Sequence, residues 1–178
     1  MPRSRILPFV LAAPMSLFAY HPLAALADSH GATCDGMTAT MVVTSSSPHV
    51  VDGTSHRDVI DIEDGGHVVN AGRGNDVICG SSGHDRINGG AGNDDVFAHG
   101  GDDVVDGNGG DDELDGQAGN DNLDGGAGDD EINGGTGNDD IQGDQGNDDL
   151  NGGPGNDDVN EDQGDDNGGT SGGHGTDG

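Results

Sequence analysis

The stretch Gly89-Gly90-Ala91-Gly92-Asn93-Asp94-Asp95-Val96-Phe97 follows the pattern G-G-x-G-x-D-x-U-x, in which U is an apolar residue. Ten units of this length follow one another from Ala71 to Asn160, each with glycine at the fourth place and aspartate at the sixth. The fourth-place glycines are Gly74, Gly83, Gly92, Gly101, Gly110, Gly119, Gly128, Gly137, Gly146 and Gly155. A fixed period of this kind predicts a repeat fold rather than a low-complexity chain.

An apolar residue recurs in the same nine-residue register over a longer part of the chain. The series is Val42, Val51, Ile60, Val69, Ile78, Ile87, Val96, Val105, Leu114, Leu123, Ile132, Ile141, Leu150 and Val159. In a chain with 29% hydrophobic residues, so long a run in register is not expected by chance. Because strand side chains alternate between two faces, these residues are expected to point inward and to form a thin aliphatic core.

The composition explains why something besides a hydrophobic core must stabilise the fold. The 178 residues suffice for one domain, but only 2% are aromatic, and 35 acidic against 5 basic residues give a net charge of −30. Such a chain without a repeat would be expected to stay disordered. The charge disfavours nucleic acid and anionic membranes as partners and favours a multivalent cation.

The N-terminus has the features of a secretory signal peptide. Arg3 and Arg5 precede an apolar stretch over 6–19, and Ala25-Leu26-Ala27 supplies a small-x-small cleavage site before Asp28. A membrane anchor is the alternative, but the stretch is short and contains two prolines. We expect export, cleavage and an extracellular location, with no membrane insertion afterwards.

Cys34 and Cys79 are the only two cysteines. Export permits a disulfide, and we expect the two residues to pair, with two free thiols as the alternative. Cys-x-x-Cys spacing is absent from the sequence, so neither a zinc knuckle nor a redox dithiol is indicated.

The ten units resemble the hemolysin-type calcium-binding repeat, the nonapeptide of RTX proteins, over about half of the chain. The resemblance implies an all-β fold, a parallel β-roll (a solenoid) in which each repeat gives a turn and a short strand and two repeats complete one coil. The chain is most similar to small secreted bacterial proteins made of these repeats behind a signal peptide, with a cysteine and an apolar strand, here Cys34 and 39–43, before the first repeat.

The sequence features and the repeat pattern together divide the chain into segments. Residues 1–27 would be the signal peptide, and 28–52 an N-terminal cap segment with the first strand. The β-roll would occupy 53–160, with its tightest repeats at 71–160, and 161–178 would be a degenerate repeat and a disordered tail. Two degenerate units, 53–61 and 62–70, would cap the roll, because a terminal coil need not bind metal.

The sixth-place aspartates are the predicted metal ligands. Stacked coils would bring residues of successive coils to about 4.8 Å, where two carboxylates repel by about 1 kcal/mol in water. Calcium accepts carboxylate and carbonyl oxygens in flexible geometry, whereas magnesium demands a tighter octahedron, so we predict calcium, at about eight ions. The predicted ligands are Asp76, Asp94, Asp112, Asp130 and Asp148 in one ladder and Asp85, Asp103, Asp121, Asp139 and Asp157 in the other.

Three further motifs need an interpretation. An EF-hand-like match over 120–131 lies within the repeat register and begins with asparagine, so we do not expect a helix-flanked site there. Four histidines that differ in their place within the repeat are not expected to bind a transition metal: His56, His67, His84 and His99. Four outward carboxylates are either a solvated face or an accessory cation stripe: Asp95, Glu113, Glu131 and Asp149.

These observations favour a non-enzymatic extracellular protein that binds calcium and folds when it meets calcium outside the cell. A core one side chain wide leaves no room for a catalytic pocket, and no catalytic spacing is present. The alternatives are a calcium-stabilised adhesin or an extracellular matrix or cell-surface structural protein, and a remnant of a larger toxin or protease. The sequence does not identify a protein partner.

Overall fold

The computed structural model describes residues 33–47 and 49–160. The expected signal peptide at 1–27, the beginning of the expected cap segment and the expected tail at 161–178 lie outside the described residues. Within the described part of the chain, no helix is long and apolar enough to cross a membrane.

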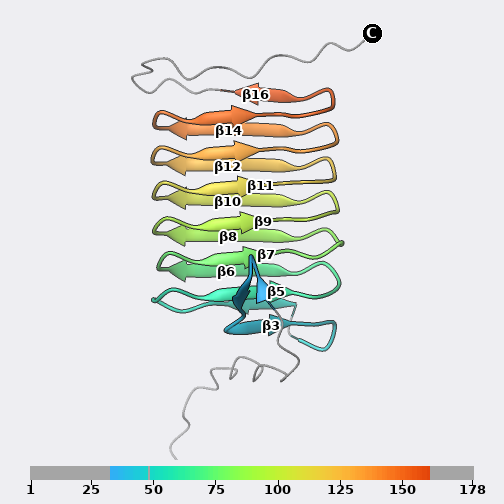
Figure 1. Ribbon diagram of the computed structural model, residues 1–178, viewed down its shortest axis with the longest axis vertical. Coiled ribbons are helices and arrows are strands. Elements are labelled where there is room, and N and C mark those ends of the chain that lie inside the picture. The colour runs from blue at the N-terminus through green and yellow to red at the C-terminus, as the bar shows by residue number, and fades with distance from the viewer. Residues whose placement is uncertain (1–32, 48, 161–178) are drawn as a thin grey trace, which may run out of the picture.

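Two parallel sheets of seven strands each make up the body of the protein (Figure 1). One sheet contains β4 (Val50–Asp52), β6 (Val68–Arg73), β8 (Arg86–Ala91), β10 (Val104–Gly109), β12 (Asn122–Ala127), β14 (Asp140–Gln145) and β16 (Asp158–Asn160). The other contains β3 (Met41–Val43), β5 (Val59–Ile62), β7 (Val77–Cys79), β9 (Asp95–Phe97), β11 (Glu113–Asp115), β13 (Glu131–Asn133) and β15 (Asp149–Asn151). A separate antiparallel hairpin consists of β1 (Thr33–Cys34) and β2 (Met37–Thr38).

Consecutive strands alternate between the two sheets, so the chain winds as a solenoid of about seven turns. Within a sheet, each strand pairs with the strand two repeats further along: Val105 lies opposite Leu123, and Leu123 lies opposite Ile141. The prediction of an all-β parallel roll with two repeats in each coil is therefore confirmed.

The core is a double row of aliphatic side chains between the sheets. Eleven of the residues predicted from the nine-residue register are at most 2% exposed: Ile60, Val69, Ile78, Ile87, Val96, Val105, Leu114, Leu123, Ile132, Ile141 and Leu150. Val51 and Val159, near the two ends of the roll, are partly buried against the same cluster. Because each strand gives the core only one or two side chains, hydrophobic burial per coil is small.

The prediction that Val42 belongs to the core register is wrong. Met41 pairs with Ile60 and Val43 with Ile62, so β3, the end strand of its sheet, is offset by one residue. Val42 therefore faces away from the core between the sheets and packs in a second apolar cluster. All three residues of β3 are apolar, so the pattern could not decide which face is buried, and a slip of one residue exchanges the faces. The Thr40 hydroxyl contributes to this register through two hydrogen bonds to Val59. Its oxygen accepts the Val59 N–H at 2.8 Å, and its O–H donates to the Val59 carbonyl oxygen at 3.1 Å.

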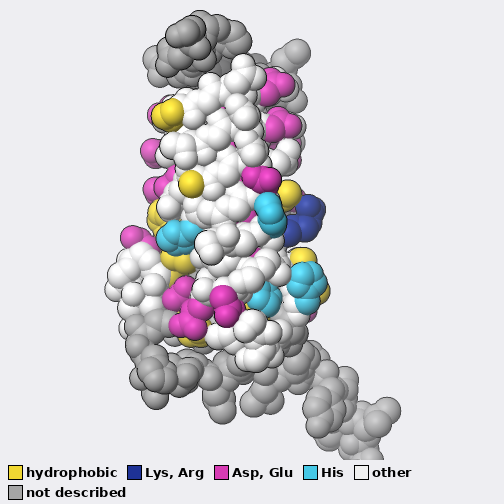
Figure 2. Space-filling view, turned by 90° about the vertical axis from the view of Figure 1, so that its right-hand side faces the viewer, with side chains coloured by type: hydrophobic (Ala, Val, Ile, Leu, Met, Phe, Trp, Pro, Cys, Tyr) yellow, Lys and Arg dark blue, Asp and Glu magenta, His cyan; other side chains and the backbone are white. Residues whose placement is uncertain are grey.

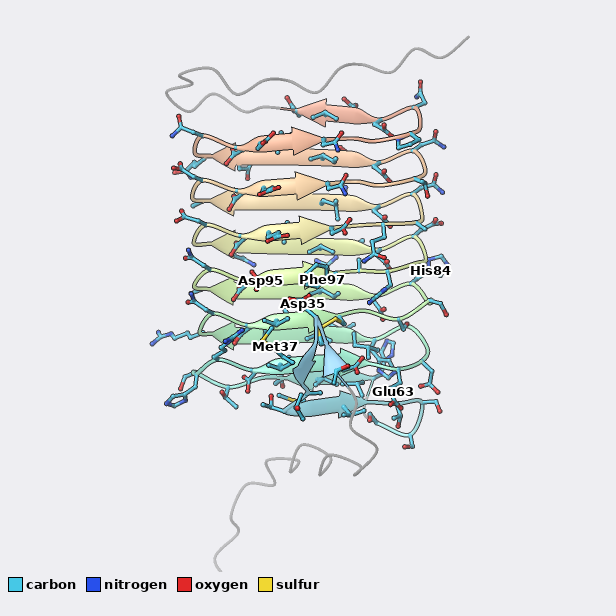
Figure 3. All side chains as sticks on the ribbon, viewed as in Figure 1. Asp35, Met37, Glu63, His84, Asp95 and Phe97 are labelled. Carbon is cyan, nitrogen blue, oxygen red and sulfur yellow. A yellow bond between two sulfur atoms is a disulfide. The ribbon has the colours of Figure 1, made fainter. Side chains whose placement is uncertain are left out.

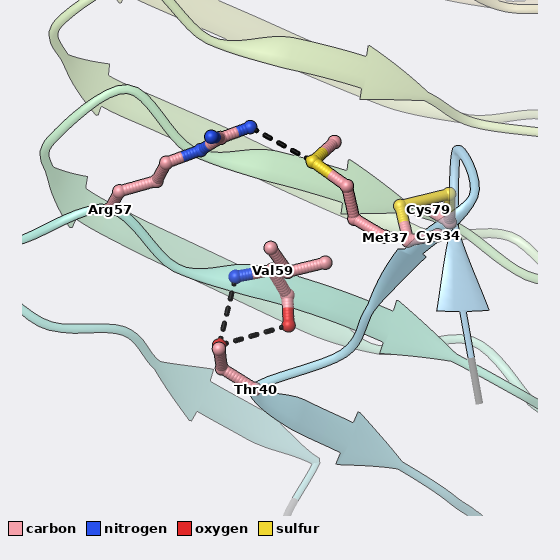
Figure 4. The surroundings of a disulfide bond; sticks show 6 residues. All are labelled: Cys34, Met37, Thr40, Arg57, Val59 and Cys79. Carbon is pink, nitrogen blue, oxygen red and sulfur yellow. Dashed lines mark hydrogen bonds between the residues drawn. A yellow bond between two sulfur atoms is a disulfide. The ribbon is translucent and has the colours of Figure 1, made fainter. Parts of the chain in front are cut away.

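A second, smaller apolar cluster lies on the outer face of the β5–β7 region. It contains Cys34, Ala39, Val42, Val59, Val77 and Cys79, with Met37 and Phe97 packed against it. Cys34 and Cys79 form a disulfide with a Cα–Cα distance of 5.6 Å, which joins the hairpin to β7 (Figure 4). The expected pairing is confirmed, and the N-terminal hairpin is attached to the first tight repeat.

We expect the double variant Cys34→Ser/Cys79→Ser to unfold more easily than the wild type in saturating calcium. The bond closes a loop of 45 residues, and the chain-entropy model assigns about 4 kcal/mol to a loop of that length. Urea denaturation followed by circular dichroism should therefore show a clearly lower midpoint for the variant. Equal midpoints would mean that the disulfide contributes nothing to the stability of the roll.

Candidate metal centre

The sixth-place aspartates occupy the ends of the turns, directly before the strands, and form two columns along the roll. Eight of them are at most 3% exposed: Asp76, Asp85, Asp94, Asp103, Asp112, Asp121, Asp130 and Asp139. Asp148 and Asp157, in the last coils, are half-buried. In the view onto the turns at the right-hand side of Figure 1, backbone and uncharged polar or glycine residues, drawn white, form most of the middle of the surface, and the visible carboxylates lie in separate groups (Figure 2). The carboxylates of these eight column aspartates are therefore held inside the turns.

One oxygen of each carboxylate in the columns is paired with backbone of the preceding coil. The Asp103 N–H donates to Asp121 Oδ1 at 2.9 Å, and the Asp121 N–H donates to Asp139 Oδ1 at 2.9 Å. The same bond, always between residues 18 apart, recurs from Asp58 to Asp148 in one column and from His67 to Asp157 in the other. These bonds fix the orientation of each carboxylate and link successive coils.

The second oxygen is buried and has no hydrogen-bond partner in most of the turns. This is the state of Oδ2 in Asp76, Asp94, Asp103, Asp112, Asp121, Asp130 and Asp139. Leaving a buried charged acceptor unpaired costs on the order of 1–3 kcal/mol or more for each group. Seven such atoms in one small protein would be a large penalty without a cation.

In five of these seven turns, those ending at Asp94, Asp112, Asp121, Asp130 and Asp139, a first-place glycine provides the space next to Oδ2, whereas alanine holds that place before Asp76 and Asp103. A side-chain carbon placed on Gly116 would lie 2.6 Å from Asp121 Oδ2 and 2.6 Å from the Gly134 carbonyl oxygen. On Gly134 it would lie 2.6 Å from Asp139 Oδ2 and 2.8 Å from the Gly152 carbonyl oxygen. A carboxylate oxygen and a carbonyl oxygen of the next coil thus converge where any other residue would place its Cβ.

The available ligand atoms suit a hard cation. Among the described residues, no group of three or more His, Cys, Asp or Glu side chains is arranged to hold a metal ion. A site must therefore combine one or two carboxylates with backbone carbonyls, which calcium accepts and zinc rarely uses. The seven unpaired oxygens and the carbonyls beside them fit calcium.

Two turns differ from the others. The Thr54 N–H donates to Asp58 Oδ2 at 2.7 Å, and the Ser81 N–H donates to Asp85 Oδ2 at 2.8 Å. Asp58 and Asp85 are buried like the rest of the columns, yet their second oxygen has a protein partner.

Burial raises the pKa of the column carboxylates. Desolvation raises the pKa of Asp112 to about 7, and the charges of Asp94 and Asp130 add to the rise, while the hydrogen bond from the Asp94 N–H opposes it. Desolvation likewise raises the pKa to about 6 for Asp94, Asp103, Asp121 and Asp130. The pKa values of Asp76 and Asp139 are raised for the same principal reason.

The sequence reasoning missed a second set of ladders, at the fifth place of the repeat. The Asn138 N–H donates to Asn120 Oδ1 at 3.0 Å, and the Asn147 N–H donates to Asp129 Oδ1 at 3.0 Å. Backbone and side-chain hydrogen bonds from Asn120 lower the pKa of the exposed Asp102. The sequence does contain the pattern, because the fifth place is Asn or Asp in every tight unit except the one with His84.

The outward carboxylates Asp95, Glu113, Glu131 and Asp149 lie side by side in register on β9, β11, β13 and β15. Asp95 projects from the sheet face, away from the turn that bears His84 (Figure 3). Desolvation raises the pKa of Glu113, and the charges of Asp95 and Glu131 add to it. Unlike the column aspartates, these four side chains do not have a buried oxygen without a partner.

The parallel coils and the two columns of inward carboxylates define a calcium-binding β-roll. A family model, the RTX calcium-binding nonapeptide repeat in four copies, matches residues 70–105, 97–132, 106–141, 124–159 and 133–167. These matches together span more than half of the 178 residues, and the chain belongs to this family, whose repeats bind calcium. Comparison with the curated proteins and with the solved structures gives no match.

We expect the metal-free roll to be more stable in mild acid than at pH 8. An aspartate whose pKa is raised from 3.8 to 6 or 7 on folding stabilises the fold below its ordinary pKa, and this stability is lost as the pH rises through the folded value. In a chelator, circular dichroism should show β structure at pH 5 that disappears between about pH 6 and 7. A transition near pH 4 would contradict this, because it would indicate exposed carboxylates.

Proposed function

We propose that this protein is an extracellular, non-enzymatic calcium-binding module that folds when it binds calcium. The observation that supports this most directly is the set of buried Oδ2 atoms without a hydrogen-bond partner in both columns. The proposed ligands are Asp76, Asp94, Asp103, Asp112, Asp121, Asp130 and Asp139, continued by Asp148 and Asp157 at the C-terminal end. Asp85 is left out because both of its oxygens have protein donors. With adjacent members of each column sharing ions, the remaining nine aspartates would take about seven ions, instead of the eight expected from all ten.

Electrostatics supports the coupling of folding to calcium. The net charge of −30 opposes compaction, and the columns place like charges at the strand spacing in surroundings with little water. A divalent ion bound between two coils turns this repulsion into attraction, and its binding free energy contributes to folding. Low calcium inside a cell and higher calcium outside would then keep the chain unfolded until export.

An extracellular location has support from two sides. RTX repeats are typical of secreted bacterial proteins, and the N-terminal sequence has the features of a secretory signal. An adhesive role has less support, because Phe97 packs against the second apolar cluster and Val50 is the one exposed large hydrophobic residue of the described part.

Small-angle scattering on the mature chain tests calcium-driven folding. We expect an expanded chain in chelator and a cooperative decrease in the radius of gyration on addition of calcium at millimolar concentration. Magnesium at the same ionic strength should have a much smaller effect, because its octahedral preference suits these carbonyl-rich turns poorly. An unchanged radius with calcium would refute the proposal, and equal compaction by magnesium would show charge screening instead of site binding.

The residue-level test compares Asp121→Asn with Asp95→Asn, which remove the same charge. Asparagine keeps the acceptor for the Asp103 N–H but removes the charge from a buried carboxylate in the middle of its column. Asp121→Asn should raise the calcium midpoint for folding several-fold, because Asp121 would serve ions on both sides. Asp95→Asn should leave the midpoint unchanged or lower it slightly, because Asp95 lies outside the columns. Equal shifts would mean that bulk charge, not the turns, binds calcium.

A further inference from the structure

The second residue of each turn has one of two backbone conformations. It has a positive φ in most turns, including 113° at Gly90, 71° at Asn108 and 66° at Gln117. A left-handed backbone is common for glycine and uncommon for other residues, so Asn108 and Gln117 show that the turn itself requires it. Thr54 and Ser81, at the same place in their turns, do not have a positive φ.

These two conformations coincide with two states of the aspartate that ends the turn. Where the second residue has a positive φ, Oδ2 of the sixth-place aspartate lacks a partner in seven turns, those ending at Asp76, Asp94, Asp103, Asp112, Asp121, Asp130 and Asp139. Where it does not, the N–H of the second residue donates to that Oδ2, as Thr54 does to Asp58 and Ser81 does to Asp85. The orientation of one peptide N–H thus determines whether the oxygen is satisfied by the protein.

In the turn at 80–85, hydrogen-bond donors of the protein satisfy both oxygens of Asp85. Besides the bond from its N–H, the Ser81 side chain places Oγ 3.1 Å from Asp85 Oδ2 and 2.5 Å from the Gly65 carbonyl oxygen, and it accepts the Gly83 N–H at 3.0 Å. Asp85 Oδ1 accepts the His67 N–H at 2.8 Å. The hydroxyl lies between a carboxylate oxygen and a carbonyl oxygen of the preceding coil, which are the kinds of atom a calcium ion would join.

We propose that Ser81 closes the turn at 80–85 against calcium, and that the backbone conformation of the second turn residue selects which turns bind the ion. The inference rests on the proposed function, because it assigns ions among the turns of a calcium-binding roll. The repeat pattern alone does not make this distinction, since Gly83, Asp85 and Ile87 all fit it.

A closed turn at this place has a physical role. Cys79 directly precedes it and forms the disulfide with Cys34, so the hairpin is attached to a coil whose carboxylate does not depend on metal. With calcium absent, both oxygens of Asp85 still have donors, whereas Oδ2 has none in six aspartates of the later coils: Asp94, Asp103, Asp112, Asp121, Asp130 and Asp139.

The test is the number of calcium ions bound per chain at saturation, measured by equilibrium dialysis, for Ser81→Gly, Ser81→Ala and Ser82→Gly. Glycine at 81 restores the Gly-Gly turn and permits a positive φ, so Ser81→Gly should bind one more ion than the wild type. Ser81→Ala keeps the N–H donor and the restriction on φ, so its count should equal that of the wild type. Ser82→Gly, an exposed neighbour with the same chemical change, should also leave the count unchanged.

A second measurement separates the possible outcomes. In chelator at pH 5, where the metal-free roll is expected to keep its β structure, Ser81→Gly should have a lower urea midpoint than Ser82→Gly, because it removes the hydrogen bonds that hold Asp85. A count for Ser81→Gly at or below that of the wild type would overturn the inference while leaving calcium binding intact. An extra ion in Ser81→Ala would overturn the role of backbone conformation. No calcium binding by the wild type would instead refute the proposed function.

Discussion

A buried aspartate that accepts a backbone N–H from the preceding coil is the interaction on which the rest of the roll depends. The bond joins residues 18 apart, so it acts between coils and sets their stacking together with the sheet hydrogen bonds. It also takes a carboxylate out of water, and only one of the two oxygens is satisfied by it in most turns. The fold therefore stacks its coils with groups that a metal-free protein would not tolerate in such number.

Several features of the sequence follow from this constraint. Glycine at the first place leaves room beside Oδ2, as at Gly116, where a side chain would collide with both Asp121 and the Gly134 carbonyl oxygen. The fifth-place ladder stacks the same turns on their outside with amide and carboxylate side chains that remain in solvent. Of these two ladders, the sixth-place one is costly without a cation, so it is the one that couples stacking to metal binding.

The period of nine predicted most of the fold because the turn and the strand each depend on it. The register residues from Ile60 to Leu150 are buried as the period requires, and the pairing of Cys34 with Cys79, expected for the only two cysteines of an exported chain, is present. Val42 could not be placed, because Met41 and Val43 beside it are also apolar and the Thr40 side chain alters the pairing with Val59. The difference between Ser81 and the glycines at its place concerns the orientation of one N–H, which a pattern of residue types does not describe.

The interactions that do not need metal are concentrated at the N-terminal end of the roll. The second apolar cluster, the disulfide and the two turns with satisfied aspartates all lie before residue 89, as do Arg57, Arg73 and Arg86. Residues 89–160 contain no Lys or Arg and more than half of the 35 acidic residues. As far as Asp139, each of these later coils adds little apolar surface and at least one buried carboxylate, so its docking is unfavourable until an ion joins it to the coil before. In such a stack, protein interactions stabilise the N-terminal coils and calcium stabilises the coils that follow. Because each coil contacts only its neighbours, the N-terminal coils provide the surface on which the later coils dock.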